Sequence, residues 1–181
     1  MLKKILVTLI LCLGLCLSFA EAKELKYHPQ NKEELKKLVE NPQINLGEID
    51  TSKITDMSEL FYERNREDFS GIETWDTSKV TDMSWMFASA TSFNQPLDKW
   101  DTSSVKYMSY IFLNAENFNQ NINSWNVSKV TYMSDMFRGA KSFNQPLDKW
   151  DTSKVKSMGD MFKGTPLEEN PPKWWGKKQK P

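Results

Sequence analysis

From about residue 50 onward, the apolar positions of this chain recur every 25 residues, with polar residues between them. Four columns of apolar residues result. The expected core consists of three of these columns in the central units: Val80, Met83, Phe87, Val105, Met108, Phe112, Val130, Met133 and Phe137. A fixed period of roughly 20 to 50 residues is typical of stacked repeat units, each of which buries its apolar face against its neighbours. We number the units 1 to 5, beginning at Asp50, Asp76, Asp101, Asn126 and Asp151.

Within a unit, the spacing predicts two kinds of element. The columns fall at i, i+3, i+6 and i+7, which is the one-face spacing of a short helical segment. A short stretch with β-branched residues, Lys79 to Asp82 in unit 2, precedes them and favours a strand. The prediction is therefore an α/β repeat solenoid over residues 46–175, with about five turns that each hold a short strand and a short helical segment.

Other columns predict turns and stacking. The Asp or Asn that opens each unit is expected to cap nearby backbone amides, as in Asp76-Thr77-Ser78. Asn94, Asn119 and Asn144 are expected to form a hydrogen-bonded ladder. A tryptophan column with the same period is expected to be half-buried packing rather than a carbohydrate platform; its members are Trp75, Trp100, Trp125, Trp150 and Trp175.

The ends of the array differ from its middle. Residues 23–45 are expected to be a capping segment, with a helix that opens at Asn31 and carries Glu34 three residues later. At the other end, Trp174 and Trp175 are expected to cover the last unit. The basic tail at residues 176–181 fits a solvated terminus or a contact with anionic lipid or glycan.

Residues 1–22 have the pattern of a secretory signal peptide: Lys3 and Lys4, an apolar run, and a small-residue site before Lys23. The alternatives are a retained membrane anchor, for which the apolar run is short, and lipidation of Cys16, for which the preceding Leu15 is larger than the motif prefers. Both cysteines lie in this segment, so the expected mature chain contains none and no disulfide. The predicted location is secreted, periplasmic or at the cell surface.

The run Val80-Thr81-Asp82-Met83-Ser84-Trp85-Met86-Phe87-Ala88-Ser89-Ala90, followed by Phe93-Asn94-Gln95, resembles the repeat of the BspA-like leucine-rich-repeat surface proteins of bacteria, a family also found among mycoplasma surface lipoproteins. The resemblance covers about residues 45 to 175. It implies a leucine-rich-repeat-like solenoid associated with adhesion or host-protein binding. It offers no catalytic residue to carry over.

Little in the composition indicates catalysis. The 24 basic and 24 acidic side chains balance, so no nucleic-acid partner is expected, and the predicted mature chain has one histidine, His28. Asp98 with Asp101, and Asp148 with Asp151, could pair for hydrolysis or bind calcium, but Asn123 and Asn126 replace the first pair in the next unit. We expect no enzymatic activity, no cofactor and no metal site.

The candidate binding residues lie where the repeat varies. Aromatic residues occupy positions that are polar in other units, and exposed aromatics are enriched where proteins bind. The candidates are Trp85, Tyr107, Tyr110 and Tyr132, with Asp82 and Asp135 at the edge; the alternative is scattered surface aromatics. The predicted function is an exported, non-enzymatic binding module for a protein or glycan on the extracellular side, with no membrane span in the processed chain. The alternative is an envelope or periplasmic structural protein without an external ligand.

Overall fold

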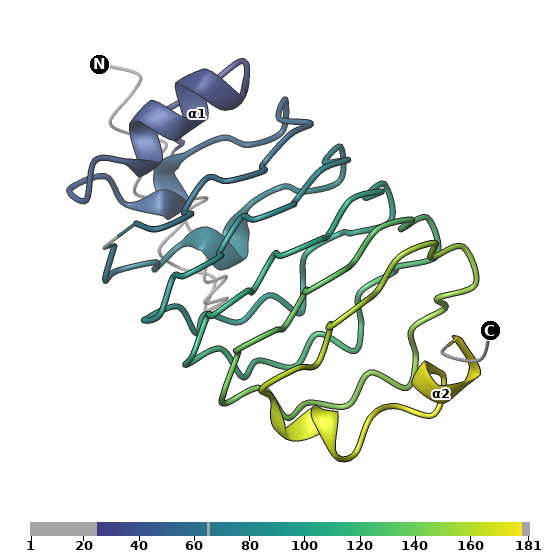
Figure 1. Ribbon diagram of the computed structural model, residues 1–181. Helices are drawn as coiled ribbons and strands as arrows, with labels where there is room; N and C mark the ends of the chain where they lie inside the picture. Colours follow the sequence, from purple (N-terminus) through teal and green to yellow (C-terminus); the bar gives the residue numbers. More distant parts are fainter. Residues whose placement is uncertain (1–24, 65, 179–181) are drawn as a thin grey trace, which may run out of the picture.

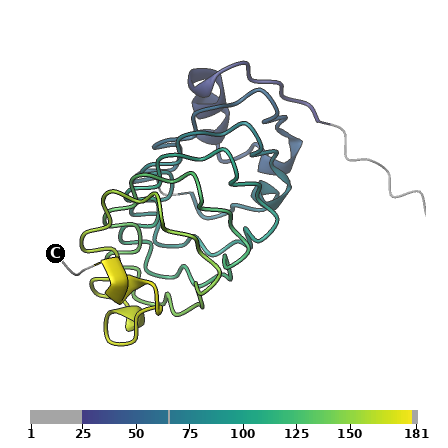
Figure 2. The same cartoon turned by 90° about the vertical axis from the view of Figure 1, so that its right-hand side faces the viewer.

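The computed structural model describes residues 25–64 and 66–178, in which the repeat units lie side by side in one row (Figure 1). The helix α1 (Lys32–Val39) lies at one end of the row, and the four-residue α2 (Trp175–Lys178) lies at the other. Three 3-10 turns complete the regular elements: η2 (Leu46–Glu48), η3 (Ile72–Thr74) and η4 (Pro166–Glu168). Seen after a quarter turn, the chain winds through similar loops from one end to the other (Figure 2).

The prediction of an α/β, leucine-rich-repeat-like solenoid, with a strand and a helical segment in each turn, was wrong. Within the described ranges, no strand longer than a single bridge forms, and α1 and α2 both lie outside the predicted strand-plus-helix segments of the units. The apolar spacing that suggested a helix comes from successive tight turns. Positive φ angles at Trp85 (61°) and Ser89 (59°), and at their equivalents, interrupt any helix in this segment.

Single parallel bridges join each unit to the next, through Asp56, Asp82, Tyr107, Tyr132 and Ser157. After the bridge, every second backbone N–H donates to a carbonyl of the following unit: in unit 2 these donors are Met83, Trp85, Phe87 and Ser89. Several intervening N–H groups instead bond three residues back within their own unit, as Met86 does to Met83. The backbone is thus paired between units without a continuous strand, which explains why a β-rich pattern gives bridges only.

The core consists of stacked aromatic columns. All nine residues expected in the core are fully buried. Phe87 stacks on the equivalent Phe61 and Phe112 with centroid distances of 5.5 and 5.6 Å. The tryptophan column stacks at 6.4 to 6.5 Å between Trp75, Trp100 and Trp125. These indoles are buried. The Nε1–H of Trp100 and of Trp125 donates to a carbonyl of the preceding unit, as Trp125 does to Leu97 at 2.8 Å, and that of Trp75 donates to Leu46 of η2. The buried polar atom of each indole is thus satisfied.

The expected turns and ladder are present. The Asp76 carboxylate accepts from the Ser78 N–H at 3.0 Å, and the opening residues of the other units bond in the same way. Asn94 Oδ1 accepts from the Asn119 N–H at 2.9 Å, and Asn119 Oδ1 accepts from the Asn144 N–H at 3.0 Å. These side chains hold the turns of successive units in register.

At the N-terminal end, α1 is capped by Asn31, whose side chain accepts from the Glu34 N–H, while Leu35 and Val39 are buried in the core. The buried Arg66 guanidinium donates to the carbonyls of Val39, Asn41 and Ile44 at 2.6 to 3.1 Å. It therefore ties the end of α1 and the following loop to unit 1. Burial lowers the pKa of Arg66.

At the C-terminal end, Trp174 and not Trp175 continues the tryptophan column. Trp174 stacks on Trp150 at 6.3 Å and donates to the Leu147 carbonyl at 2.7 Å. Trp175 turns onto Phe162, with a centroid distance of 4.9 Å and an edge-on geometry, and so covers the phenylalanine column. The predicted signal peptide (residues 1–22) and residues 179–181 of the predicted tail lie outside the described residues.

Candidate binding surface

The four aromatic candidates form two stacked pairs. Trp85 and Tyr110 lie face to face, with ring centroids 4.1 Å apart and planes at 20°. Tyr107 and Tyr132, which lie at the bridges, stack at 5.9 Å and 15°. No ring contact joins the two pairs within the described part of the chain. The predicted single patch is therefore two separate stacks, each along the row of units.

Sequence reasoning missed Tyr62, which extends the first pair. The Tyr62 ring meets Trp85 edge-on at 5.4 Å, so Tyr62, Trp85 and Tyr110 form a continuous aromatic strip across units 1 to 3. Tyr62 lies in the part of unit 1 that departs from the repeat, where column comparison has no equivalent aromatic to detect. The sequence held one signal for it: Tyr62 follows Glu59 by three residues, and Glu59 is the unit 1 equivalent of Trp85.

The aromatic strip and the tyrosine pair differ in exposure. Tyr107 and Tyr132 are 41% and 42% exposed, among the most exposed large hydrophobic side chains described. Trp85, Tyr110 and Tyr62 are half-buried. The tyrosine pair therefore offers more open ring surface, whereas the rings of the strip are more buried.

Backbone geometry sets Trp85 and Tyr110 apart from other surface aromatics. Their φ angles are 61° and 63°, in the left-handed region. The equivalent positions in units 4 and 5 hold Asp135 and Asp160, a residue type that tolerates this conformation. A bulky aromatic residue with this backbone is uncommon, and such strain is concentrated at functional sites. The repeat architecture imposes the backbone in every unit, but it does not require an aromatic side chain there.

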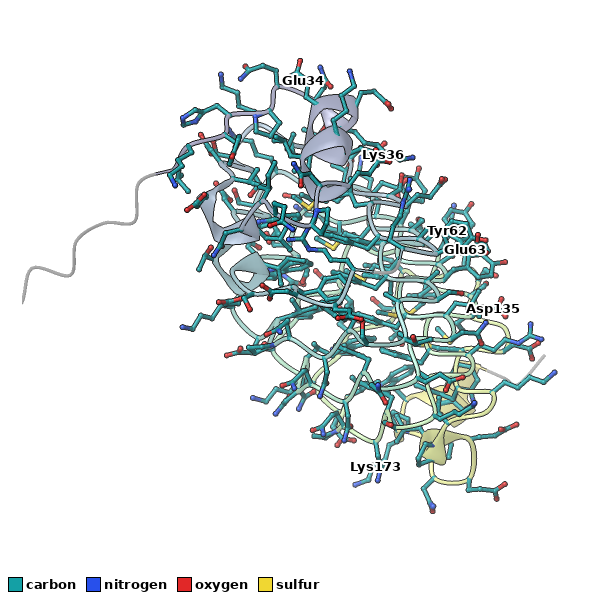
Figure 3. The ribbon with its side chains drawn as sticks, turned by 90° about the vertical axis from the view of Figure 1, so that its left-hand side faces the viewer. Glu34, Lys36, Tyr62, Glu63, Asp135 and Lys173 are labelled. Carbon is teal, nitrogen blue, oxygen red and sulfur yellow. The ribbon has the colours of Figure 1, made fainter. Side chains whose placement is uncertain are left out.

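Carboxylates lie at the unit 1 end of the strip. The Tyr62 hydroxyl is hydrogen-bonded to the Glu63 side chain, which raises the pKa of Tyr62, and Glu59 lies exposed at the position equivalent to Trp85 in unit 1. Tyr62, Glu63 and Asp135 project on one side of the molecule (Figure 3). The N-terminal half of this surface is thus both aromatic and acidic.

The two predicted edge carboxylates are bound within the protein. Asp82 Oδ1 accepts from the Ser84 N–H at 2.8 Å. Asp135 accepts from the Arg138 guanidinium at 3.1 Å, and its side chain is only 14% exposed. Both residues therefore contribute to local structure, and Arg138 brings a positive charge to the C-terminal half of the surface.

Other parts of the chain offer little chemistry. Asp98 and Asp148 are exposed, and the described residues contain no group of three or more acidic, His or Cys side chains placed to hold a metal. His28 Nδ1 lies 3.1 Å from the Asp50 carboxylate. The Asp50 pKa is lowered to about 2, first by hydrogen bonds from Ser52 and then by His28. This pair lies at the outset of unit 1, away from the aromatic residues in sequence.

In the described ranges, no helix has the length and apolar character needed to cross a bilayer. The chain shows no significant similarity to a curated protein or to a solved structure. The model of one family, described as "Mycoplasma protein of unknown function, DUF285", matches residues 32–69 and 64–175, which include α1 and all five repeat units. The chain belongs to this family.

Proposed function

We propose that this protein is an exported, non-enzymatic binding module that recognises a protein or glycan through Trp85, Tyr110 and the neighbouring Tyr107 and Tyr132. The observation that carries the proposal is the placement of Trp85 and Tyr110 at left-handed backbone positions where the fold accepts Asp elsewhere. Local conformation disfavours these aromatics, and the two stack on each other at the surface rather than in the core. Because the backbone of these positions does not call for an aromatic residue, we attribute the two rings to binding.

The proposal includes export and a relation to the BspA-like bacterial surface proteins. The support for export is the charged start, apolar run and small-residue site of residues 1–22. The support for the relation is the repeated motif around Met83 to Phe87 together with Phe93-Asn94-Gln95. N-terminal sequencing of the protein from cells tests export directly: a mature N-terminus at Lys23 supports it, and a retained Met1 contradicts it.

The site is tested with an array of glycans and extracellular matrix proteins. The full chain is compared with the double variant Trp85→Asn/Tyr110→Asn. Asn favours the left-handed conformation, so these substitutions should preserve the fold while removing both rings. We expect binding to fall by about 10- to 100-fold, the size of a loss of about 1.4 to 2.8 kcal/mol at an interface anchor.

The matched control is Asp160→Asn, which changes the same position of unit 5, where no aromatic residue lies. It should bind like the wild type. Equal binding by the wild type and the double variant would contradict the proposed site. No binding of any array member by a correctly folded wild type would contradict the proposal and favour an envelope structural role.

A further inference from the structure

The backbone at the C-terminal end of the row differs from the backbone at every internal boundary. In each of units 1 to 4, four alternate N–H groups donate to the next unit; in unit 4 the donors are Met133, Asp135, Phe137 and Gly139. Their acceptors are the carbonyls of Ser157, Gly159, Met161 and Lys163. In this segment, the N–H groups of one unit always donate to the carbonyls of the next unit. The last unit therefore has the same donors but no following unit to accept from them.

In unit 5, the equivalent donors are Met158, Asp160, Phe162 and Gly164. Gly164 donates to the Glu168 carboxylate at 2.7 Å. For the N–H groups of Met158, Asp160 and Phe162, no acceptor is present among the described residues. We call these three groups the open donor edge. Unpaired edges of this kind are templates for pairing with another chain.

One acceptor lies beside the open donor edge. The carbonyls of Thr55, Thr81, Lys106 and Thr131 each accept from the N–H of the next unit, as Thr131 does from Lys156 at 2.8 Å. The equivalent carbonyl of unit 5 belongs to Lys156, and no donor to it occurs in the described part of the chain. The edge thus offers one acceptor followed by three alternate donors, which is the hydrogen-bonding pattern of each internal boundary without its fourth donor, here Gly164.

The terminal cap leaves room beside this edge. A hollow of about 510 Å³ lies there, lined by Gly159, Asp160, Phe162, Lys163, Glu168 and Trp175. Trp175 covers Phe162 from one side, yet Met158 is 7% exposed, whereas its equivalents in units 1 to 4 are fully buried. The cap therefore leaves the part of unit 5 around Met158 less completely covered than the internal units.

We propose that the open donor edge binds a segment of a partner protein that adopts the turn-rich backbone of a repeat unit and runs parallel to unit 5. The segment would present carbonyl oxygens at alternate residues, as each internal unit does to the unit before it, and an apolar side chain toward Phe162 and Trp175. This mode of recognition takes its affinity from main-chain hydrogen bonds and its specificity from adjacent side-chain pockets. It uses a surface separate from the aromatic residues of the proposed function.

A second copy of this chain fits the edge poorly. Two C-terminal edges placed together would oppose donors to donors. The complementary carbonyls, those of unit 1, lie at the end that α1 covers: Lys32 of α1 contacts Ser58 and lies 3.5 Å from Asp56, and Glu40, the residue that caps α1, pairs with Arg64 at 2.7 Å. The occupant is therefore a segment from a different protein.

The test uses a peptide with the sequence of residues 131–140, TYMSDMFRGA, because the carbonyls of this segment accept from unit 3 within the protein. The peptide is titrated into the 15N-labelled full chain and followed by NMR. We expect downfield shifts of the Met158, Asp160 and Phe162 amide protons and at least a ten-fold slowing of their exchange with solvent. A scrambled peptide of the same composition should leave these amides unchanged.

Two glycine variants provide a matched pair. An added Cβ meets nothing within 4 Å at either Gly159 or Gly176, so the backbone at both positions accepts a side chain. Gly159 lines the hollow, and Gly159→Trp should weaken peptide binding at least ten-fold, whereas Gly176→Trp should leave it unchanged. Trp85→Asn/Tyr110→Asn should also leave it unchanged, which separates this proposal from the proposed function.

Three results would overturn the proposal: the three amides do not respond at saturating peptide, the scrambled peptide shifts them equally, or the shifts fall on the aromatic strip. Sedimentation of the chain alone gives a further criterion. Self-association that protects the same three amides would replace the partner protein by a second copy and so refute the proposal as stated.

Discussion

The two ends of the repeat row are closed in different ways. At the N-terminal end, a capped helix buries Leu35 and Val39, and the Arg66 guanidinium satisfies backbone carbonyls at the end of that helix. At the C-terminal end, Trp174 and Trp175 cover the aromatic columns, and three backbone donors of unit 5 stay without an acceptor in the described residues. Covering the apolar columns and pairing the edge backbone are thus separate tasks, and covering the columns does not by itself pair the edge.

The substitution expected to weaken the N-terminal end most is Arg66→Ala. The carbonyls of Val39, Asn41 and Ile44 would lose a charged donor, and an unsatisfied buried acceptor costs about 1 to 3 kcal/mol. Because three acceptors lose their donor together, we expect the free energy of unfolding to fall by about 4 kcal/mol, measured by urea denaturation. Arg64→Ala is the control, because the exposed Arg64–Glu40 pair should contribute at most about 0.5 kcal/mol. Similar losses for both variants would contradict the assigned role of Arg66.

A second comparison uses one glycine from each end. Gly71 has a φ angle of 93°, and an added Cβ would lie 2.2 Å from the Gly47 backbone nitrogen. Gly71→Ala should therefore destabilise the protein by about 3 kcal/mol through strain and overpacking. Gly159→Ala, where a Cβ meets nothing, should stay within about 0.5 kcal/mol of the wild type. Thermal unfolding of the two variants measures the difference, and equal midpoints would show that the N-terminal end is not the tighter one.

The C-terminal closure depends on Trp174, which is half-buried. Trp174→Ala removes the ring stacked on Trp150 and the hydrogen bond to Leu147, and should reduce stability by about 2 kcal/mol. Trp174→Phe keeps a ring and loses only the hydrogen bond, so about 1 kcal/mol should be lost. Chemical denaturation distinguishes the two variants. A full wild-type stability for Trp174→Ala would show that the cap does not stabilise the row.

The smallest effect concerns the turn that opens unit 1. The pKa of Asp50 is lowered from 3.8 to about 2, chiefly by hydrogen bonds from Ser52. A lowered carboxyl pKa stabilises the folded state above the unfolded pKa, and this contribution is lost as pH falls through the folded pKa. The stability difference between the wild type and Asp50→Asn should therefore be constant above about pH 5 and decline toward pH 2.

Because Asp50 is near the surface, this difference should stay below about 1 kcal/mol. Unfolding measured at several pH values tests it. Asn126, which makes the same turn contact to Ser128 in unit 4, shows that Asn fits the position. A difference that did not change with pH would assign the effect to something other than the Asp50 charge.

Columns that repeat were predictable from the sequence, because each residue packs on a copy of itself. The burial of Phe87 and Phe112 and the hydrogen bonds of Asn94 and Asn119 follow from this rule. The elements within a unit were not predictable. The apolar spacing of Met83, Met86 and Phe87 fits a helix as well as a series of tight turns, and only the positive φ angles decide between them.

The candidate site shows the same division. The exposed aromatic residues could be found by looking for variation within the columns, but their separation into two stacks could not, because it depends on where neighbouring units place the rings. Tyr62 escaped detection because unit 1 departs from the repeat. The choice of Trp174 over Trp175 for the tryptophan column also depends on the local path of the chain, which a 25-residue count does not contain.

By itself, the sequence determined the period, the buried columns and the turn residues of this protein, because local chemistry repeated at a fixed interval can be satisfied only by equivalent neighbours. The tertiary structure decided the direction of backbone pairing between units and therefore which end presents donors. Side-chain patterns carry no information on that direction, since the same apolar columns stack whichever way the N–H groups point. The open donor edge of Met158, Asp160 and Phe162 is therefore visible only in the tertiary structure.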